Sequence, residues 1–459
     1  MARRRRFIAP FDLAVTSLGP KGCGQGEHEG KVVLVRGAPP GSVVRVQPFK
    51  RKKGLLHGRR VGLVSPAPDA VEPRCALFGL CGGCTLQEMT LERQRQERAA
   101  HVQRLLEPLE GVTWHAPRAG GEAYGYRNKV ELTYGSARYV SEADLAAGLP
   151  IDGRFLGFHA PGRFDRVVDA PRCELVSEGV NALIAVAREH LEHSALAPWN
   201  PREATGFWRH LVLRETTLGQ RLVAIYTAPP KDEVVARAEL DALAAAFPEV
   251  TGVCWYVNDR VADAAIGACR AVLRGEPFIE EALGDLRLRL SVESFFQTNT
   301  AGARVLYDLV GEAIGSGNRL LDLYCGTGSI GLYLADRVKE VVGVERVESA
   351  VADARENAVR AGIGHARFIA GSVEQVAEGL EADVVVVDPP RAGLHPKAAR
   401  WLAGLAGAKV LIYVACNPAS LARDREILAE GGWELTDVWT VDLFPQTGHM
   451  EAVARFVRR

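Results

Sequence analysis

The C-terminal part of the chain alternates short apolar segments with longer amphipathic ones. Five segments have the length and β-branched content of buried strands: "RLLDLYC" (319–325), "EVVGVE" (340–345), "ARFIAG" (366–371), "DVVVVD" (383–388) and "VLIYVAC" (410–416). Helical segments such as 329–338 and 351–362 separate them. This alternation predicts an α/β fold, a Rossmann-like doubly wound domain that binds its ligands at the carboxyl ends of parallel strands.

A glycine-rich turn, "LYCGTGS", follows the first of these strands. Gly326 and Gly328 permit a tight turn and a close approach of the backbone to a ligand. Glu345 ends the next strand, where a carboxylate can accept hydrogen bonds from both hydroxyls of a ribose. Because the third glycine of the dinucleotide fingerprint is not at its usual place, the turn favours S-adenosylmethionine over a dinucleotide.

Two chemically active side chains end neighbouring strands. Asp388 closes the segment 383–388 and is followed by two prolines, which stiffen the loop and hold the carboxylate at a fixed angle. Cys416 closes the segment 410–416, so both side chains are expected in one crevice. A free thiol is only about 3% ionised at pH 7. Asn417 and Arg423 are the candidates for activating it.

A thiol beside a nucleotide pocket suits one kind of methyl transfer. Carbon 5 of a uracil is a poor nucleophile until a thiolate adds to carbon 6 and turns the ring into an enolate. A base must later remove the carbon-5 proton. Glu451 and His449, which lie just before the last apolar segment, are the two candidates. Arg391 stands where amino-group methyltransferases carry a stacking aromatic residue, which argues against an exocyclic amine as acceptor.

The N-terminal segment is basic and β-rich. Residues 1–60 contain 14 Lys and Arg against three Asp and Glu, although the whole chain has no net charge. Short segments between residues 10 and 64 predict a small OB-like β-barrel, a fold that often binds nucleic acid. We therefore predict an RNA-binding barrel over 1–66, a mixed α+β central domain over 67–290 and the Rossmann-like domain over 291–459. An amphipathic helix over 91–110 is expected to pack on the last domain.

Four cysteines have the spacing of a metal site. Cys75, Cys81 and Cys84 form C-x5-C-x2-C, and Cys173 is a distant fourth ligand. Four thiolates suit an iron-sulfur cluster or zinc, and unliganded packed cysteines are the plain alternative. No continuous apolar run reaches the roughly 18 residues of a membrane span, and no secretory signal is visible. We expect a cytoplasmic monomer with no membrane partner.

The motifs closely resemble the RNA uracil-5-methyltransferase family. The matching stretches are "SFFQTNT" (294–300), "LLDLYCGTG" (320–328), "DPPRAGL" (388–394), "VACNPASLARD" (414–424) and "DLFPQTGHMEAVARF" (442–456). "RCALFGLCGGCTLQ" (74–87) and "YRNKVEL" (126–132) extend the likeness upstream. The resemblance is strongest to the type that acts on 23S ribosomal RNA and carries an N-terminal TRAM barrel.

The resemblance implies roles for individual residues. It implies that Cys416 attacks carbon 6 and that Glu451 accepts the proton. It implies that S-adenosylmethionine contacts Gln297, Tyr324, Glu345 and Asp388. It also implies that a [4Fe-4S] cluster is bound by Cys75, Cys81, Cys84 and Cys173. The chain departs from the family at four positions, with Tyr324 for Phe, Ser329 for Asn, Pro390 for Ala and Ala415 for Ser.

The expected function is therefore methylation of carbon 5 of a flipped uridine in structured RNA, with 23S ribosomal RNA as the first choice and transfer RNA as the alternative. A cytosine-5 methyltransferase is disfavoured because "DPPRAGL" contains no cysteine. An RNA chaperone that keeps the fold without the chemistry is disfavoured because Cys416 and Glu451 are both present. Phe295 and Phe296 are candidates for stacking on the base or for core packing.

Overall fold

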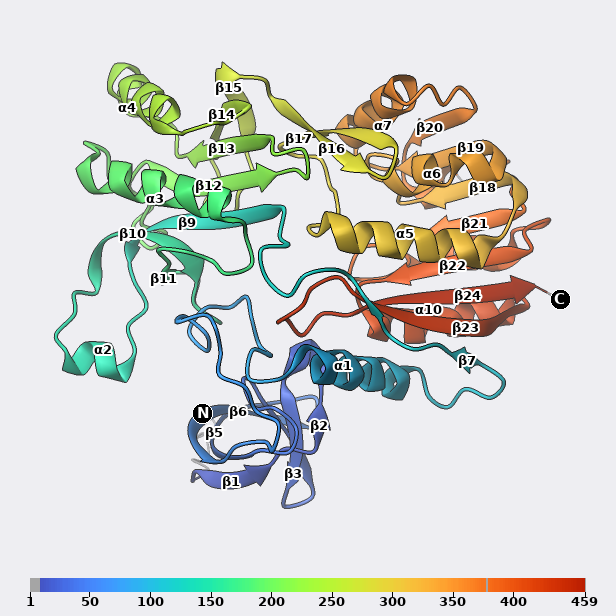
Figure 1. Cartoon of the computed structure of the whole chain (residues 1–459), viewed down its shortest axis with the longest axis horizontal. Helices are drawn as coiled ribbons and strands as arrows, with labels where there is room; N and C mark the ends of the chain where they lie inside the picture. The colour runs from blue at the N-terminus through green and yellow to red at the C-terminus, as the bar shows by residue number, and fades with distance from the viewer. Residues whose placement is uncertain (1–8, 377–378, 459) are drawn as a thin grey trace, which may run out of the picture.

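A computed structural model describes residues 9–376 and 379–458. Over these residues the strands form an N-terminal sheet, a central sheet, a short hairpin and a C-terminal sheet (Figure 1). In the view of Figure 1 the central and C-terminal sheets lie at opposite ends of the molecule, and the N-terminal sheet lies below them.

The N-terminal sheet has the strand order β1-β5-β6-β4-β3-β2. Its strands are β1 (Phe11–Ala14), β2 (Ser17–Leu18), β3 (Gly24–His28), β4 (Lys31–Val35), β5 (Val43–Lys52) and β6 (Leu55–Ser65), with a 3-10 turn η1 (Pro20–Gly22) between β2 and β3. Leu13, Val33, Val44 and Val46 are buried together in its small core. The alternation of buried and exposed residues along β5 gives the sheet one apolar and one solvated face.

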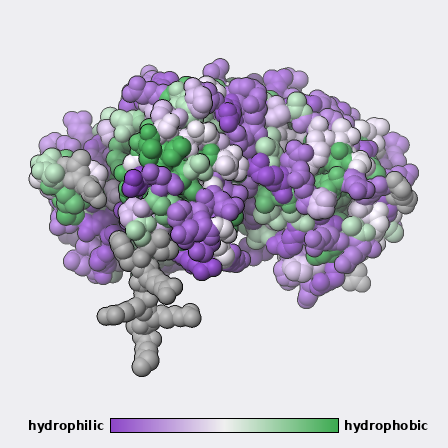
Figure 2. Space-filling view, turned by 90° about the horizontal axis from the view of Figure 1, so that it is seen from below, coloured by the Kyte–Doolittle hydropathy of each residue, from purple (hydrophilic) through white to green (hydrophobic). Residues whose placement is uncertain are grey.

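The β5–β6 hairpin extends basic and apolar side chains into solvent. Lys50 to Lys53 are exposed at its tip. Phe49, Val61, Leu63 and Val64 are exposed large hydrophobic residues of the same two strands. Figure 2 views the molecule from the side on which this sheet lies and shows a largely hydrophilic face with a gathering of hydrophobic residues in its left half.

The central sheet has the order β11-β10-β9-β12-β13-β14-β15 and is antiparallel except for the β13–β14 pair. Its strands are β9 (Lys129–Ala137), β10 (Asp152–His159), β11 (Val167–Asp169), β12 (Trp208–Glu215), β13 (Arg221–Thr227), β14 (Gly252–Val257) and β15 (Ala268–Gly275). Helices α3 (Glu178–His193) and α4 (Glu233–Ala246) cover one face, and α2 (Glu142–Ala146) lies between β9 and β10. The hairpin β16 (Phe278–Leu283) and β17 (Leu286–Ser291) packs on the other face.

The C-terminal sheet has the order β20-β19-β18-β21-β22-β24-β23-β7. Its main strands are β18 (Gly317–Leu323), β19 (Val338–Glu345), β20 (Ala366–Ala370), β21 (Val384–Val387), β22 (Val410–Ala415), β23 (Trp433–Asp442) and β24 (Glu451–Arg458). The strands from β20 to β22 are parallel, whereas β24 runs antiparallel between β22 and β23. This is the predicted doubly wound fold, extended by an antiparallel pair.

Helices cover both faces of the C-terminal sheet. They are α5 (Thr300–Ile314), α6 (Ser329–Tyr333), η2 (Ala335–Arg337), α7 (Glu348–Arg360), α8 (Val373–Val376), α9 (Pro396–Gly404) and α10 (Pro418–Glu430). Two buried clusters, one on each face, hold the apolar residues of the strands. In the described residues, no helix is long and apolar enough to span a bilayer.

Helix α1 (Leu91–Leu106) belongs to the C-terminal packing although it precedes the central sheet in sequence. Its Val102 and Leu106 lie in the core of the C-terminal sheet. The helix ends at Leu106 because Glu107 is extended before Pro108. Strands β7 (Thr113–Trp114) and β8 (Arg118–Ala119) then pair with β23. The expected packing of this helix is observed, and the predicted domain boundaries at 66 and 290 stay a prediction.

The N-terminal sheet touches the C-terminal sheet at one close backbone contact. A Cβ atom at Gly448, in the loop between β23 and β24, would collide with the backbone of Lys21 and Gly22 in η1. Gly448→Ala is therefore expected to lower the free energy of unfolding by about 1–3 kcal/mol. Gly404→Ala is the matched control, because a Cβ at Gly404 in α9 meets nothing within 4 Å. A thermal midpoint for the Gly448 variant equal to that of the control would contradict this contact.

Candidate active site

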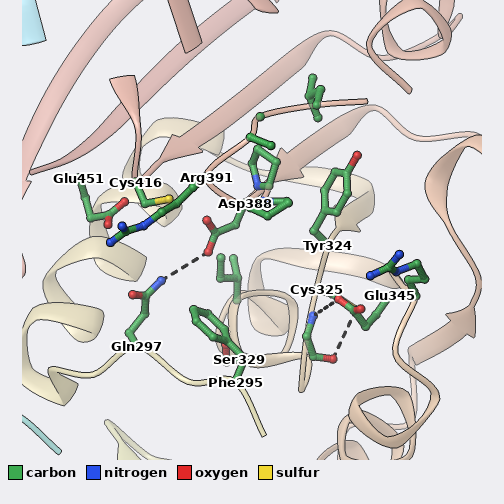
Figure 3. A pocket seen from close by; sticks show the side chains of 18 of the residues that line it. Phe295, Gln297, Tyr324, Cys325, Ser329, Glu345, Asp388, Arg391, Cys416 and Glu451 are labelled. Atoms are coloured by element: carbon green, nitrogen blue, oxygen red, sulfur yellow. Dashed lines mark hydrogen bonds between the residues drawn. The ribbon is translucent and has the colours of Figure 1, made fainter. Parts of the chain in front are cut away.

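A cavity of about 1070 Å³ opens at the carboxyl edge of the C-terminal sheet. It is lined by the turn after β18, the end of β19, the loops after β21 and β22, and the loop before β24. The structure brings six predicted site residues to this cavity: Gln297, Tyr324, Glu345, Asp388, Cys416 and Glu451. In Figure 3, Cys416, Glu451 and Arg391 lie at one end, and Tyr324 and Glu345 lie at the other.

The turn after β18 is built from left-handed residues. Gly326 and Gly328 have φ angles of 54° and 78°, and Tyr324 has a φ angle of 63°, which is uncommon for a bulky side chain. A Cβ at Gly328 would lie 2.8 Å from the Phe368 ring, so glycine is required there. Glu345 braces the turn, because its Oε2 accepts a hydrogen bond from Gly326 N at 3.2 Å.

Asp388 lies between the two ends of the cavity and is joined to Gln297. Gln297 Nε2 donates to Asp388 Oδ2 at 3.4 Å (Figure 3). Burial raises the pKa of Asp388 to about 7, and the Gln297 amide opposes this rise. Gln297 is itself positioned by the central domain segment, since Asn128 Nδ2 donates to its carbonyl oxygen at 3.0 Å. The carboxyl group of Asp388 therefore has a fixed direction.

Sheet pairing places Cys416 beside Glu451. Ala415, the last residue of β22, pairs with Ala452 of the antiparallel β24. The next residue outward on each strand is Cys416 on one side and Glu451 on the other, and Figure 3 shows the two side chains next to each other. A thiol and a carboxyl group from positions 35 residues apart thus meet at the cavity.

The surroundings of this pair disfavour negative charge. Burial raises the pKa of the Cys416 thiol to about 12; Glu451 and Asp388 add to the rise and Arg391 opposes it. Burial also raises the pKa of Glu451 to about 8, with Asp388 adding to the rise and Arg391 again opposing it. Among the described residues, Glu451 Oε2 has no hydrogen-bond partner. Arg391 is therefore a cation that acts on both the Cys416 thiol and the Glu451 carboxyl group.

Arg391 replaces the two residues expected to activate the thiol. Asn417 Nδ2 donates to the Arg391 carbonyl at 2.8 Å, and Arg423 Nη2 donates to the Ala392 carbonyl at 2.9 Å. Both side chains thus hold the loop that carries Arg391 and contact its backbone, not the sulfur. In the sequence, Arg391 is distinguished only by standing where amino-group methyltransferases carry an aromatic residue. Its position beside Cys416 depends on the loop and could not be found from spacing.

The two candidate bases differ in strength. His449 lines the cavity 3.4 Å from Arg391, and burial together with Arg391 lowers the pKa of its imidazole to about 4. A carboxylate whose pKa is near 8 is a stronger base than such an imidazole.

The two phenylalanines Phe295 and Phe296 lie in different surroundings. Phe296 is buried in the core, whereas Phe295 is 63% exposed and lines the cavity. Of these two phenylalanines, Phe295 is the one placed to stack on a nucleobase in the cavity.

Comparison with known proteins identifies the family. A family model described as tRNA (Uracil-5-)-methyltransferase matches residues 278–459. An uncharacterised RNA methyltransferase of Chlorobaculum tepidum is 37% identical over 98% of this chain and 96% of its own. A second one, from Caldanaerobacter subterraneus, is 36% identical over 94% of this chain and 95% of its own. The chain belongs to the RNA uracil-5-methyltransferase family.

A solved structure supports the same assignment for this methyltransferase. The tRNA (uracil-54, C5)-methyltransferase of Pyrococcus abyssi, in complex with S-adenosyl-L-homocysteine, matches with a TM-score of 0.76 and 27% identity. The match covers 97% of this chain and 100% of the other. The likeness therefore extends through all three sheets of the methyltransferase.

The four predicted metal cysteines come from two segments that meet beside the cavity. All nine cysteines are free within the described residues. Burial raises the pKa of Cys84 to about 12, and the neighbouring thiols of Cys173, Cys81 and Cys75 add to the rise, so the four are electrostatic neighbours. In the described part of the chain, however, no three His, Cys, Asp or Glu side chains close around a single metal ion. Gly82 and Gly83 of the same loop line the cavity.

The raised pKa of the thiol gives a test in the free methyltransferase. Alkylation of Cys416 by iodoacetamide is expected to be slow at pH 7 and to rise about tenfold per pH unit past pH 9, because only the thiolate reacts. Arg391→Leu is expected to slow it further by removing the nearby cation. Mass spectrometry of the labelled peptides measures this, with the exposed Cys269 as reference in the same sample. An alkylation rate at Cys416 that levels off below pH 8 would show that the pKa of this thiol is not raised, and would contradict the prediction.

Proposed function

We propose that this methyltransferase transfers a methyl group from S-adenosylmethionine to carbon 5 of a uridine in structured RNA through a covalent Cys416 adduct. The observation that carries the proposal is that Cys416 and Glu451, which flank the Ala415–Ala452 pair, lie side by side at one end of a cavity whose other end is the glycine-rich turn. A nucleophile and a proton acceptor side by side are the two groups that substitution at carbon 5 requires.

The proposed steps use these residues in order. The Cys416 thiolate adds to carbon 6 of the flipped uracil, and the electron pair of the C5=C6 π bond moves onto carbon 5 and the carbonyl oxygen on carbon 4. Once carbon 5 carries the new methyl group, Glu451 takes the carbon-5 proton. The C–H electron pair then forms the C5=C6 bond, and the C6–S pair returns to sulfur. Arg391 faces both groups and stabilises the thiolate before addition and after release.

We assign the binding of S-adenosylmethionine to Gln297, Tyr324, Glu345 and Asp388. When bound, this cofactor supplies an electrophilic methyl group. The donor set fits it, since a glycine turn, a strand-end carboxylate and a fixed Asp388 line one continuous cavity. Tyr324 also offers a buried hydroxyl that has no hydrogen-bond partner among the described residues.

Two substitutions separate the roles of the reacting pair. Cys416→Ala is expected to abolish methylation while RNA binding persists, because the ring is no longer activated. Glu451→Gln is expected to leave addition and methyl transfer intact and to trap an RNA–protein adduct that survives denaturing electrophoresis. A Glu451→Gln enzyme that turns over at the wild-type rate would remove Glu451 from the mechanism.

We propose structured RNA as the substrate and 23S ribosomal RNA as its first candidate. The basic tip of the β5–β6 hairpin and the exposed Phe49 offer phosphate contacts and a stacking surface. Transfer RNA is the alternative. It is favoured by the structural match to the tRNA (uracil-54, C5)-methyltransferase, which covers 97% of this chain. Mapping 5-methyluridine in ribosomal and transfer RNA of cells that express the wild type or Cys416→Ala separates the two.

We also propose that Cys75, Cys81, Cys84 and Cys173 hold a [4Fe-4S] cluster beside the RNA end of the cavity. Its support is the mutual proximity of four reduced thiols and the contribution of their loop to the cavity wall.

Protein purified without oxygen is expected to carry about four iron and four sulfide per chain. Cys84→Ser should lower this content. Because methyl transfer itself needs no electron, the proposed role of the cluster is to position RNA, and the same variant should also weaken RNA binding. Cys254→Ser, at a buried cysteine of β14, is the control that should keep the full content. Stoichiometric zinc, or full iron content in the Cys84 variant, would contradict the cluster.

A further inference from the structure

The loop between β23 and β24 (443–450) delivers Glu451 to the cavity. Glu451 is 2% exposed, and in the described structure its Oε2 has no hydrogen-bond partner. Glu451 is the first residue of β24 and pairs with Val441 of β23, so the loop ends directly at the residue that carries this carboxylate. The backbone of the loop is irregular, and Gln446 within it has a left-handed φ angle of 69°. Such a conformation persists only where surrounding contacts enforce it.

Arg98 of α1 holds both ends of this loop. Its side chain is 2% exposed, and its Nη2 forms an ion pair with Asp442 Oδ2 at 2.7 Å. Its Nη1 donates to the His449 carbonyl at 2.7 Å and to the Phe444 carbonyl at 3.4 Å. One guanidinium thus joins the residue before the loop, a residue near its start and a residue near its end.

Gln94, one turn earlier on α1, holds the middle of the loop. Its side chain is fully buried. Gln94 Oε1 accepts a hydrogen bond from Gln446 N at 2.9 Å, and Gln94 Nε2 donates to Gln446 Oε1 at 2.9 Å. Gln94 thus makes two hydrogen bonds to Gln446, the loop residue whose backbone is left-handed. The other partners of Gln94 Nε2 are the carbonyl groups of Leu86 and Met89.

We propose that Gln94 and Arg98 are positioning residues that hold Glu451 at the angle needed to remove the carbon-5 proton. A buried ion pair contributes little net stability compared with apolar packing, because both charges lose water. Its clearer use here is directional, since apolar side chains cannot fix three separate atoms of an irregular loop. We call Gln94 and Arg98 together the clamp. The inference rests on the proposed function, because it links the clamp to the step that Glu451 performs.

The clamp is expected to affect one step selectively. Addition of Cys416 and methyl transfer do not use Glu451, whereas release of the methylated RNA does. A displacement of about 1 Å at a reacting group can cost about 100-fold in rate. Loosening the loop should therefore slow turnover up to that extent and leave the covalent RNA adduct at a higher level than in the wild type.

Three clamp variants and two controls test this. Arg98→Met and Gln94→Met remove the polar contacts at similar side-chain length, and Arg98→Lys keeps the charge that faces Asp442. Arg209→Met is the matched control, because Arg209 is 1% exposed and donates to the carbonyl groups of Asn258, Arg260 and Ala262, away from the cavity. Glu451→Gln marks the adduct level reached without the base.

Adduct and turnover are measured together on the full-length protein with an RNA that it methylates. We expect adduct in Arg98→Met and Gln94→Met well above wild type, partial rescue in Arg98→Lys, and wild-type levels in Arg209→Met. The inference is overturned if the folded clamp variants match Arg209→Met while Glu451→Gln traps adduct. If Glu451→Gln traps none, the proposed function itself fails. Should Arg98→Met not fold, Gln94→Met decides by the same criterion.

Discussion

The antiparallel insertion of β24 between β22 and β23 is the constraint on which the site depends. Parallel strands bring their carboxyl ends to one edge, which gathers the glycine turn, Asp388 and Cys416. An antiparallel strand instead brings its first residue to that edge. Because β24 starts there and pairs Ala452 with Ala415, Glu451 stands next to Cys416. A parallel strand in the same place would have put Glu451 at the opposite edge of the sheet.

This arrangement concentrates acidic groups that are largely buried. Glu451 and Asp388 raise the pKa of the Cys416 thiol, Asp388 also raises the pKa of Glu451, and Arg391 opposes both rises. A carboxyl group with a raised pKa is a better proton acceptor once ionised. The same burial makes the thiol reluctant to ionise, so in the proposed mechanism the uracil ring and Arg391 stabilise the charge that develops. The cavity is thus suited to proton removal more than to spontaneous thiolate formation.

Much of the site could be predicted because its signals are local. The strand segments, the glycine turn and the strand-end residues Asp388 and Cys416 follow from periodicity and from the strand-end rule. Strand β3 could not be predicted from its residues, since "GQGEH" lacks β-branched residues. Gly24 and Gly26 are needed there because a Cβ at either would strike a neighbouring carbonyl. The contacts of Gln94 and Arg98 could not be predicted, since they join residues about 350 positions apart and leave no local pattern. The placement of Arg391 could not be predicted because it depends on the conformation of the loop after β21.

The central claim is that the Cys416 sulfur bonds to carbon 6 of a uracil. RNA carrying 5-fluorouridine at the methylated position tests it directly, because Glu451 can remove a proton from carbon 5 but not a fluorine. In the presence of S-adenosylmethionine the adduct should persist, and protease digestion with mass spectrometry should find the RNA fragment on the peptide that contains Cys416. An adduct on another residue, or none from an enzyme that methylates the unmodified RNA, would contradict the account.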